Sequence, residues 1–243
     1  MNISKVKLKL VKQKLALQPV NRGIQTSHKV KIDPAQGQEI ADGYDNLQHK
    51  PNDPDVKAAY DSLIKETKQQ FDEMTKNGLK ITKLKEGEDG YITADEMHND
   101  INNNNHLSYF PTEQGFGANS ENFQDHPLLK GSGVTGVDGK ELTNNDLFRI
   151  VHDVNGHNLA DKADFSPEGE HQAYLTHKQQ YSPLAGKALF TETAGQANWG
   201  IFNRKSGESN RQKIIRGDTE NLDFSEQKAG LFPDSIINGN HHL

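Results

Sequence analysis

Two histidines five residues apart, His152 and His157, are the first feature of the chain that suggests chemistry. Five residues on an ideal α-helix turn through about 140° beyond a full circle, so an undistorted helix would aim the two imidazoles apart. Asn155-Gly156 lies between them, and glycine accepts backbone angles that other residues avoid, as in the π-type bulges common at functional sites. We therefore expect the helix to distort or end here, so that both rings face one metal ion.

A carboxylate from another helix would complete a metal site, because a chain without cysteine must hold zinc or iron with His, Asp and Glu. Glu192 is the preferred third ligand, since it lies in a stretch of apolar and small residues where an unpaired carboxylate is costly to bury. Glu170 and His177 are seven residues apart and so share one helix face. We expect them to hydrogen-bond to the ligands or to substitute for them, and Asp153 is the remaining polar candidate.

A structural role is the competing interpretation of the same residues, because histidines in amphipathic helices more often pack or face water than bind metal. Under that interpretation the His and Glu side chains form a buried polar network that specifies the fold. Glu66 and Gln70, four residues apart, are expected to point inward from a neighbouring helix, whereas His171 is expected to face water.

The bulk composition limits the partners. The net charge of -6 over 243 residues argues against a general phosphate-tracking surface, which leaves only the Lys-rich residues 5–14 for nucleic acid. No apolar run approaches the roughly 20 residues of a membrane span, and lysines interrupt any apolar core of a secretory signal. The absence of cysteine fits a reducing compartment. We therefore expect a cytoplasmic protein with no membrane segment.

The residue pattern predicts a mainly α fold, a single compact helical domain with long loops and few short strands. Residues 1–33 form a Lys-rich arm, residues 34–236 the helical domain that carries the metal site, and residues 237–243 a disordered C-terminal end. Helical spacing and capping residues predict helices near 54–76, 93–102, 144–155, 167–180 and 183–199. The loop 110–117 is expected to cover the site.

Two parts of the sequence resemble known protein families. One spans about Ile40 to Pro233 and resembles an uncharacterised family of tailed bacteriophages that also occurs in large polyvalent phage proteins. The strings that carry it are His49-Lys50-Pro51-Asn52-Asp53-Pro54, Asn105-His106-Leu107, Phe110-Pro111-Thr112, Val151-His152-Asp153, Gly156-His157 and Glu192-Thr193 with Gly195-Gln196. This resemblance implies a phage origin and a place in the host cytoplasm or the virion, but no activity.

The second resemblance concerns the metal. The string from His152 to His157 is similar to the His-Glu-Leu-Leu-Gly-His signature of the aromatic amino acid hydroxylases, which bind Fe(II) with two His and a later Glu. It implies that His152, His157 and Glu192 are the ligands and that Asp153 takes the place of the family's acidic residue.

Three functions therefore stand as expectations. The first is a mononuclear non-haem Fe(II) oxygenase or hydroxylase whose substrate the sequence leaves unknown. The second is a zinc hydrolase on the same ligands, with Glu170 or Asp153 as general base. The third is a non-enzymatic virion or host-takeover protein that uses the arm to bind a partner. The oligomeric state is not indicated by the sequence.

Overall fold

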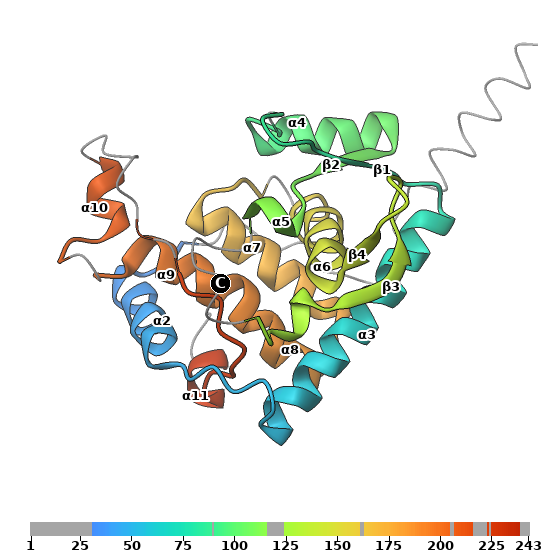
Figure 1. The fold of residues 1–243 in the computed structure, drawn as a ribbon. Helices are drawn as coiled ribbons and strands as arrows, with labels where there is room; N and C mark the ends of the chain where they lie inside the picture. Colours follow the sequence, from blue (N-terminus) through green and yellow to red (C-terminus); the bar gives the residue numbers. More distant parts are fainter. Residues whose placement is uncertain are drawn as a thin grey trace, which may run out of the picture.

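The fold is mainly helical, as predicted, with two small two-stranded sheets (Figure 1). The computed structural model describes residues 31–88, 90–115, 124–160, 163–204, 207–215, 223 and 225–238. Its α-helices are α2 (Pro34–Asn46), α3 (Pro54–Lys76), α4 (Ala94–Asn99), α5 (Thr112–Gly115), α6 (Asn144–His152), α7 (Pro167–His177), α8 (Pro183–Phe190), α9 (Gln196–Phe202), α10 (Asn210–Ile215) and α11 (Asp234–Ile237).

Shorter elements connect these helices. They are the π-helices η1 (Asp100–Asn104), η4 (Asp153–His157) and η6 (Thr191–Gly195), the 3₁₀ turns η3 (Pro127–Leu129) and η5 (Lys178–Gln180), and the strands β1 (Lys80–Lys83), β2 (His106–Tyr109), β3 (Gly131–Thr135) and β4 (Glu141–Thr143). Strands β1 and β2 pair in parallel, and β3 pairs antiparallel with β4.

Side-chain caps explain where the principal helices begin. The side chains of Asp33, Asp53, Ser166 and Ser182 accept backbone N–H bonds at the starts of α2, α3, α7 and α8, and in each case a proline follows the cap. The predicted helices 54–76, 167–180 and 183–199 are thus confirmed, although helix α2 was missing from the prediction. The pair Asp33-Pro34 was the signal that could have found it.

Helix α6 lies between two apolar clusters. On one side Phe148 joins the larger core, in which α3 packs against α8 and α2 packs against α9 around Tyr60 and Trp199. On the other side Ile150 and Val151 pack over the β1–β2 pair and α4. Burial on both sides fixes the rotation of α6, and this rotation decides where His152 points.

The start of α6 is held by a reciprocal capping box. Thr143 accepts the Asp146 backbone N–H through its hydroxyl, and the Asp146 carboxylate accepts the Thr143 backbone N–H. Asp146 also accepts hydrogen bonds from the backbone and hydroxyl of Thr112, at 2.8 and 2.7 Å. The segment that contains Phe110 is therefore anchored to the helix that carries His152.

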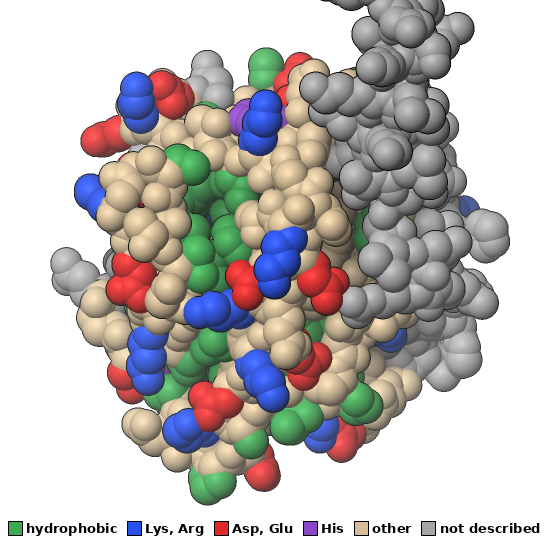
Figure 2. Space-filling view, turned by 90° about the vertical axis from the view of Figure 1, so that its right-hand side faces the viewer, with side chains coloured by type: hydrophobic (Ala, Val, Ile, Leu, Met, Phe, Trp, Pro, Cys, Tyr) green, Lys and Arg blue, Asp and Glu red, His purple; other side chains and the backbone are tan. Residues whose placement is uncertain are grey.

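The surface carries mixed charge. Figure 2 shows one face on which Lys and Arg side chains are interspersed with Asp and Glu. Among the described residues, every helix is too short or too polar to cross a membrane. The predicted Lys-rich arm lies outside the described residues as far as residue 30, whereas Ile32 packs against the core. At the other end, Ile237 belongs to α11 and packs against the core, and residues 239–243 lie outside the described part.

Glu66 joins the middle of α3 to the start of α8. Its carboxylate accepts hydrogen bonds from the Ser182 backbone N–H and hydroxyl, both at 2.7 Å, and from the Ser62 hydroxyl at 2.7 Å. Burial alone would raise the pKa of Glu66, but these hydrogen bonds outweigh it and hold the pKa below its usual range. Because the folded pKa is lowered, the stabilisation exists above the unfolded pKa and is lost as the pH falls through the folded one.

We therefore expect Glu66→Gln to lower the free energy of unfolding by about 0.5–1 kcal/mol at pH 7, since the carboxylate is partly exposed. The difference from the parent should shrink below about pH 4.3, the ordinary pKa of glutamate. Urea denaturation between pH 3 and 7 measures both. Asp61→Asn, which removes an exposed partner of Lys57 on the same helix, is the control and should change little. An equal loss at pH 3 and pH 7 would contradict the assignment.

Candidate metal centre

A π-turn brings the two histidines of the site to one side. Helix α6 ends at His152 and continues into η4, where the Asn158 N–H bonds to the Asp153 carbonyl at 2.9 Å. A turn closed by an i→i+5 bond contains one more residue than an α-turn, so residues five apart return to the same face. The predicted distortion between His152 and His157 is confirmed.

Two glutamines fix the middle of this turn. The side-chain amide of Asn155 donates to the Gln70 oxygen at 2.7 Å, and Gln180 donates to the Asn155 carbonyl at 2.9 Å. Gln70 is buried, so the prediction that its face of α3 points inward is confirmed. Helix α3 and the end of the α7 segment thus hold the π-turn from both sides.

Gly156 is required by close packing. A Cβ at this position would lie 2.9 Å from Nδ1 of His152 and 3.3 Å from the Ala173 carbonyl oxygen. Only glycine lets the turn approach α7 while the ring of His152 occupies the space between them. The Asn-Gly pair therefore serves both the bend of the chain and the contact with α7.

Three ligand-type atoms converge where η4 meets α7. One atom each from His152, His157 and Glu170 lies within 4.8 Å of the other two. The Glu170 Oε2 atom is 3.3 Å from Nε2 of His157 and 3.7 Å from Nε2 of His152. Both histidines are buried, whereas 29% of the Glu170 side chain is exposed. Two imidazoles and one carboxylate therefore form a group that solvent reaches from the Glu170 side.

Aromatic side chains enclose the imidazoles. Phe148 stacks on His152 with ring centroids 6.0 Å apart, and Phe165 meets His157 edge-on at 5.4 Å. Behind His152, the two Nδ1 atoms of His152 and His177 lie 3.0 Å apart, within hydrogen-bond distance. Glu170 and His177 both contact His152, so the prediction that they share one face of α7 is confirmed.

The charges of the group are strongly coupled. Burial would lower the pKa of His157, but the carboxylates of Glu170 and Asp153 raise it to about 9. Burial would likewise raise the pKa of Glu170, but His157 and His152 hold it well below its usual range. Burial, together with His152 and His157, holds the pKa of His177 well below its usual range. His177 is thus kept neutral while His157 and Glu170 attract one another.

Glu192 does not belong to this group, contrary to the prediction that it is the third ligand. Its carboxylate accepts hydrogen bonds from the Tyr60 hydroxyl and, at 2.9 Å, from the Gln196 amide. The Nε2 of His126 lies 3.4 Å away. Because Nδ1 of His126 accepts the Leu128 N–H, Nε2 carries the proton and faces Glu192. Neutral donors, rather than a cation, satisfy this buried carboxylate, and Glu170 takes the third place beside the histidines.

Sequence reasoning missed Tyr60 and His126 as partners of Glu192. Both are fully buried, and they come from α3 and from the segment before η3, far from Glu192 in the chain. The only sequence signal was Tyr60 on the apolar stripe of its helix. The expectation that His171 faces water was also wrong, because its side chain is buried and its ring lies 6.0 Å from that of Tyr174.

Two cavities lie near the small sheets. One, of about 420 Å³, is bordered by Asp153 and Phe165 beside the histidines and by Phe110. Phe110 thus lies where the loop 110–117 was expected to cover the site, although Thr112–Gly115 is the short helix α5 and residues 116–117 lie outside the described part. The other cavity is larger, about 910 Å³, and has charged walls.

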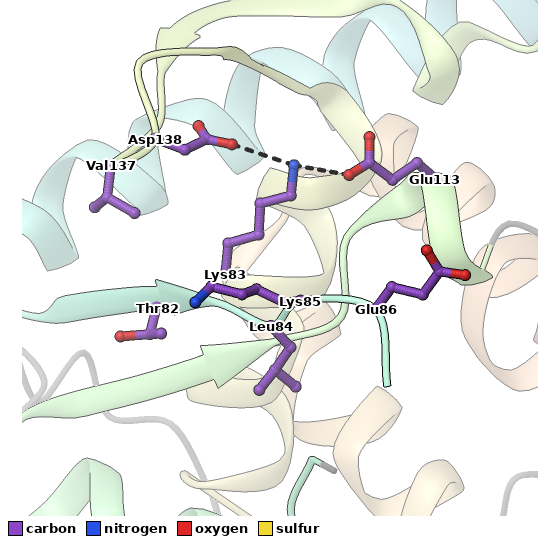
Figure 3. Close-up of a pocket in the computed structure, with 8 residues that line it drawn as sticks. All are labelled: Thr82, Lys83, Leu84, Lys85, Glu86, Glu113, Val137 and Asp138. Carbon is purple, nitrogen blue, oxygen red and sulfur yellow. Dashed lines mark hydrogen bonds and ion pairs between the residues drawn. The ribbon is translucent and has the colours of Figure 1, made fainter. Parts of the chain in front are cut away.

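Lys83 bridges the larger cavity. Its Nζ lies 2.9 Å from Glu113 and 3.3 Å from Asp138, as the dashed lines in Figure 3 show. The hydrogen bond to Glu113, with further support from Asp138, raises the pKa of Lys83. Charges that satisfy one another give this cavity no convergent ligand set.

Comparison of the chain with protein-family models, with curated proteins and with solved structures finds no match. The resemblances to a tailed-phage family and to the aromatic amino acid hydroxylases therefore stay predictions.

We predict that Gly156→Ala destabilises the protein by about 1–3 kcal/mol, because the new methyl group overlaps the His152 ring and the α7 backbone. Metal binding should weaken with it, since the ring must move. Gly186→Ala is the control, because a Cβ there meets nothing within 4 Å in helix α8 and alanine favours helix. Thermal unfolding and metal titration measure the two effects. Equal behaviour of the two variants would contradict the packing role of Gly156.

Proposed function

We propose that the protein is a mononuclear non-haem Fe(II) enzyme that uses O₂ to oxidise its substrate, with His152, His157 and Glu170 as the metal ligands. The observation that carries the proposal is the convergence of two imidazole nitrogens and one carboxylate oxygen at the junction of η4 and α7. Two His and one carboxylate on one face are the ligand set of many non-haem Fe(II) oxygenases. The other half of the coordination sphere stays available for substrate and oxidant.

The unpaired nitrogen of His152 supports a cation at this position. Its Nε2 is buried and has no hydrogen-bond partner among the described residues, and such an orphaned atom is costly unless something binds it. Ligand atoms about 2.1 Å from a common ion lie at most about 4.2 Å apart. The separations of 3.3 and 3.7 Å to Glu170 fall within that limit, and the ligand nitrogens of the two imidazoles lie within 4.8 Å of one another.

His177 sets the protonation state that ligation needs. If Nε2 of His152 presents its lone pair to a metal, the ring proton lies on Nδ1 of His152 and Nδ1 of His177 accepts it, 3.0 Å away. His177 is fully buried and cannot reorient easily. It therefore positions the ring of His152, as the partners of metal-bound histidines commonly do.

The remaining polar group at the site is Asp153. It borders both the histidines and the smaller cavity, so it can accept or return a proton at the substrate end. The aromatic rings of Phe148 and Phe165 limit the access of water to the imidazoles. Bound iron would supply the activation of O₂, which no side chain of this chain can provide.

A zinc hydrolase is the second candidate, because zinc accepts the same two-His, one-carboxylate set. The position of Asp153 favours it, since a carboxylate beside the ligands could act as general base toward a bound water. The two candidates differ in metal and in reaction but not in ligands. The phage resemblance would place either activity in the cytoplasm of the infected cell.

A purely structural role is the third candidate. His157 and Glu170 lie within ion-pair distance of one another, so they form a stable pair without metal. That pair leaves Nε2 of His152 3.7 Å from Glu170 and without a hydrogen bond among the described residues, which is why we rank this role last.

The test is elemental analysis of protein purified without a His-affinity step and reconstituted with Fe(II) under anaerobic conditions. We expect about one equivalent of iron, as a single three-ligand site requires. His152→Ala, His157→Ala and Glu170→Ala should each lose it, because each removes one ligand.

Two acidic variants are matched controls. Glu168→Gln changes an exposed carboxylate on the same helix as Glu170, and Glu192→Gln keeps the size of the side chain first predicted as a ligand. Both should retain the metal. Loss of metal from Glu192→Gln with retention in Glu170→Ala would overturn the assignment, and zinc in place of iron would favour the hydrolase.

A further inference from the structure

The smaller cavity opens directly beside the candidate ligands. Asp153, the residue after His152, forms part of its wall, and so does Phe165, whose ring edge meets His157. The walls come from the β1–β2 region, from helix α4 and from the α6–η4 junction. The complete lining is Leu84, Gly90, Tyr91, Met97, Ser108, Tyr109, Phe110, Arg149, Asp153 and Phe165.

Most of the cavity wall is apolar, including the part that the polar residue Tyr91 contributes. The hydroxyl of Tyr91 donates to Asp100 at 2.8 Å and accepts the Ser108 backbone N–H at 2.7 Å. Since both bonds are made within the protein, Tyr91 offers the cavity its ring rather than its hydroxyl. Met97, another lining residue, is fully buried. Such a wall favours a bulky apolar group over a sugar or a phosphate.

The mouth of the cavity is apolar too. Phe110 and Phe165 are 45% and 44% exposed, although most large apolar residues of the described chain are buried. Arg149 and Asp153 are the only charged residues in the lining of this cavity. They are one helical turn apart and lie next to His152 in the chain. A ligand that fills the cavity would thus have its apolar part on the aromatic rings and its polar part toward the metal ligands.

We propose that this cavity of about 420 Å³ holds a bulky apolar group of the substrate, with the Arg149–Asp153 end directing the reacting part toward His152 and His157. The proposal rests on the proposed function for the reaction, but the binding of an apolar group does not depend on metal. The group can belong to a free small molecule or to a side chain of a peptide, since the walls recognise the same chemistry in both. The larger cavity lacks this character, because Lys83, Glu113 and Asp138 occupy its walls (Figure 3).

The test uses indole as the free probe and an acetylated, amidated peptide with a central tryptophan as the second probe. Ligand-observed NMR titrations are made with the metal-free protein and with protein loaded with Co(II), a paramagnetic substitute for Fe(II). We expect at least one probe to bind both forms. With Co(II) present, the bound probe should show enhanced relaxation, because the cavity adjoins the ligands.

Phe110→Ala and Phe165→Ala should each weaken probe binding by about five- to tenfold, the effect of losing one aromatic contact. Leu184→Ala, at a residue of similar exposure (43%) on helix α8, is the control and should leave binding unchanged. Phe110 and Phe165 are both partly exposed, so their alanine variants should fold. Circular dichroism checks this.

The outcomes separate the two proposals. Tighter binding of indole identifies a free small molecule, whereas tighter binding of the peptide identifies a polypeptide substrate. Absence of binding by both probes overturns the cavity proposal, as does binding that Leu184→Ala weakens as much as Phe165→Ala. Binding without any paramagnetic effect, in protein that has taken up Co(II), overturns its place beside the metal. If the protein binds a probe but takes up no metal, the cavity proposal holds and the proposed function is contradicted.

Discussion

The hydrogen bond from the Asn158 N–H to the Asp153 carbonyl adds one residue to the turn that follows His152, and the candidate centre depends on that addition. With an α-turn in its place, the ring of His157 would rotate away from His152 by more than a third of a circle. The π-turn is less favourable than an α-turn, so neighbouring segments must hold it. Gln70 and Gln180 do so through Asn155, and Gly156 permits the close contact with α7.

The carboxylates of Glu192 and Glu170 are satisfied in different ways. Glu192 accepts hydrogen bonds from the neutral donors Tyr60 and Gln196, and Nε2 of His126 lies 3.4 Å away, an arrangement that suits a fixed charge in a permanent network. Glu170 instead faces two imidazoles whose Nε2 atoms both lie within 4 Å, and it is partly exposed. A network of the first kind stabilises a fold, whereas a group of the second kind can exchange a proton for a metal ion.

The sequence predicts the histidine pair and its π-turn because the signal is local. His152, Asn155-Gly156 and His157 lie within six residues, and helical geometry alone requires the distortion. The helical class and the positions of α3, α7 and α8 follow from equally local caps and periodicity. The sequence favoured Glu192, whereas the structure places Glu170 beside the histidines. This difference could not be predicted because it depends on how α7 packs against η4 and α8 against α3. Glu192 also lies in the π-helix η6, which changes the direction in which its side chain points relative to a regular α-helix. Residues 191–195 contain no sequence signal for this π-helix comparable to the Asn-Gly pair of η4.

Anomalous X-ray diffraction from crystals soaked anaerobically with Fe(II) tests the central claim most directly, because it locates the ion without reference to activity. The account predicts one peak about 2.1 Å from Nε2 of His152, Nε2 of His157 and an oxygen of Glu170, with His177 still bonded to the far side of His152. A peak beside Glu192 would contradict the account, and so would the absence of a peak near His152 in crystals soaked with excess Fe(II).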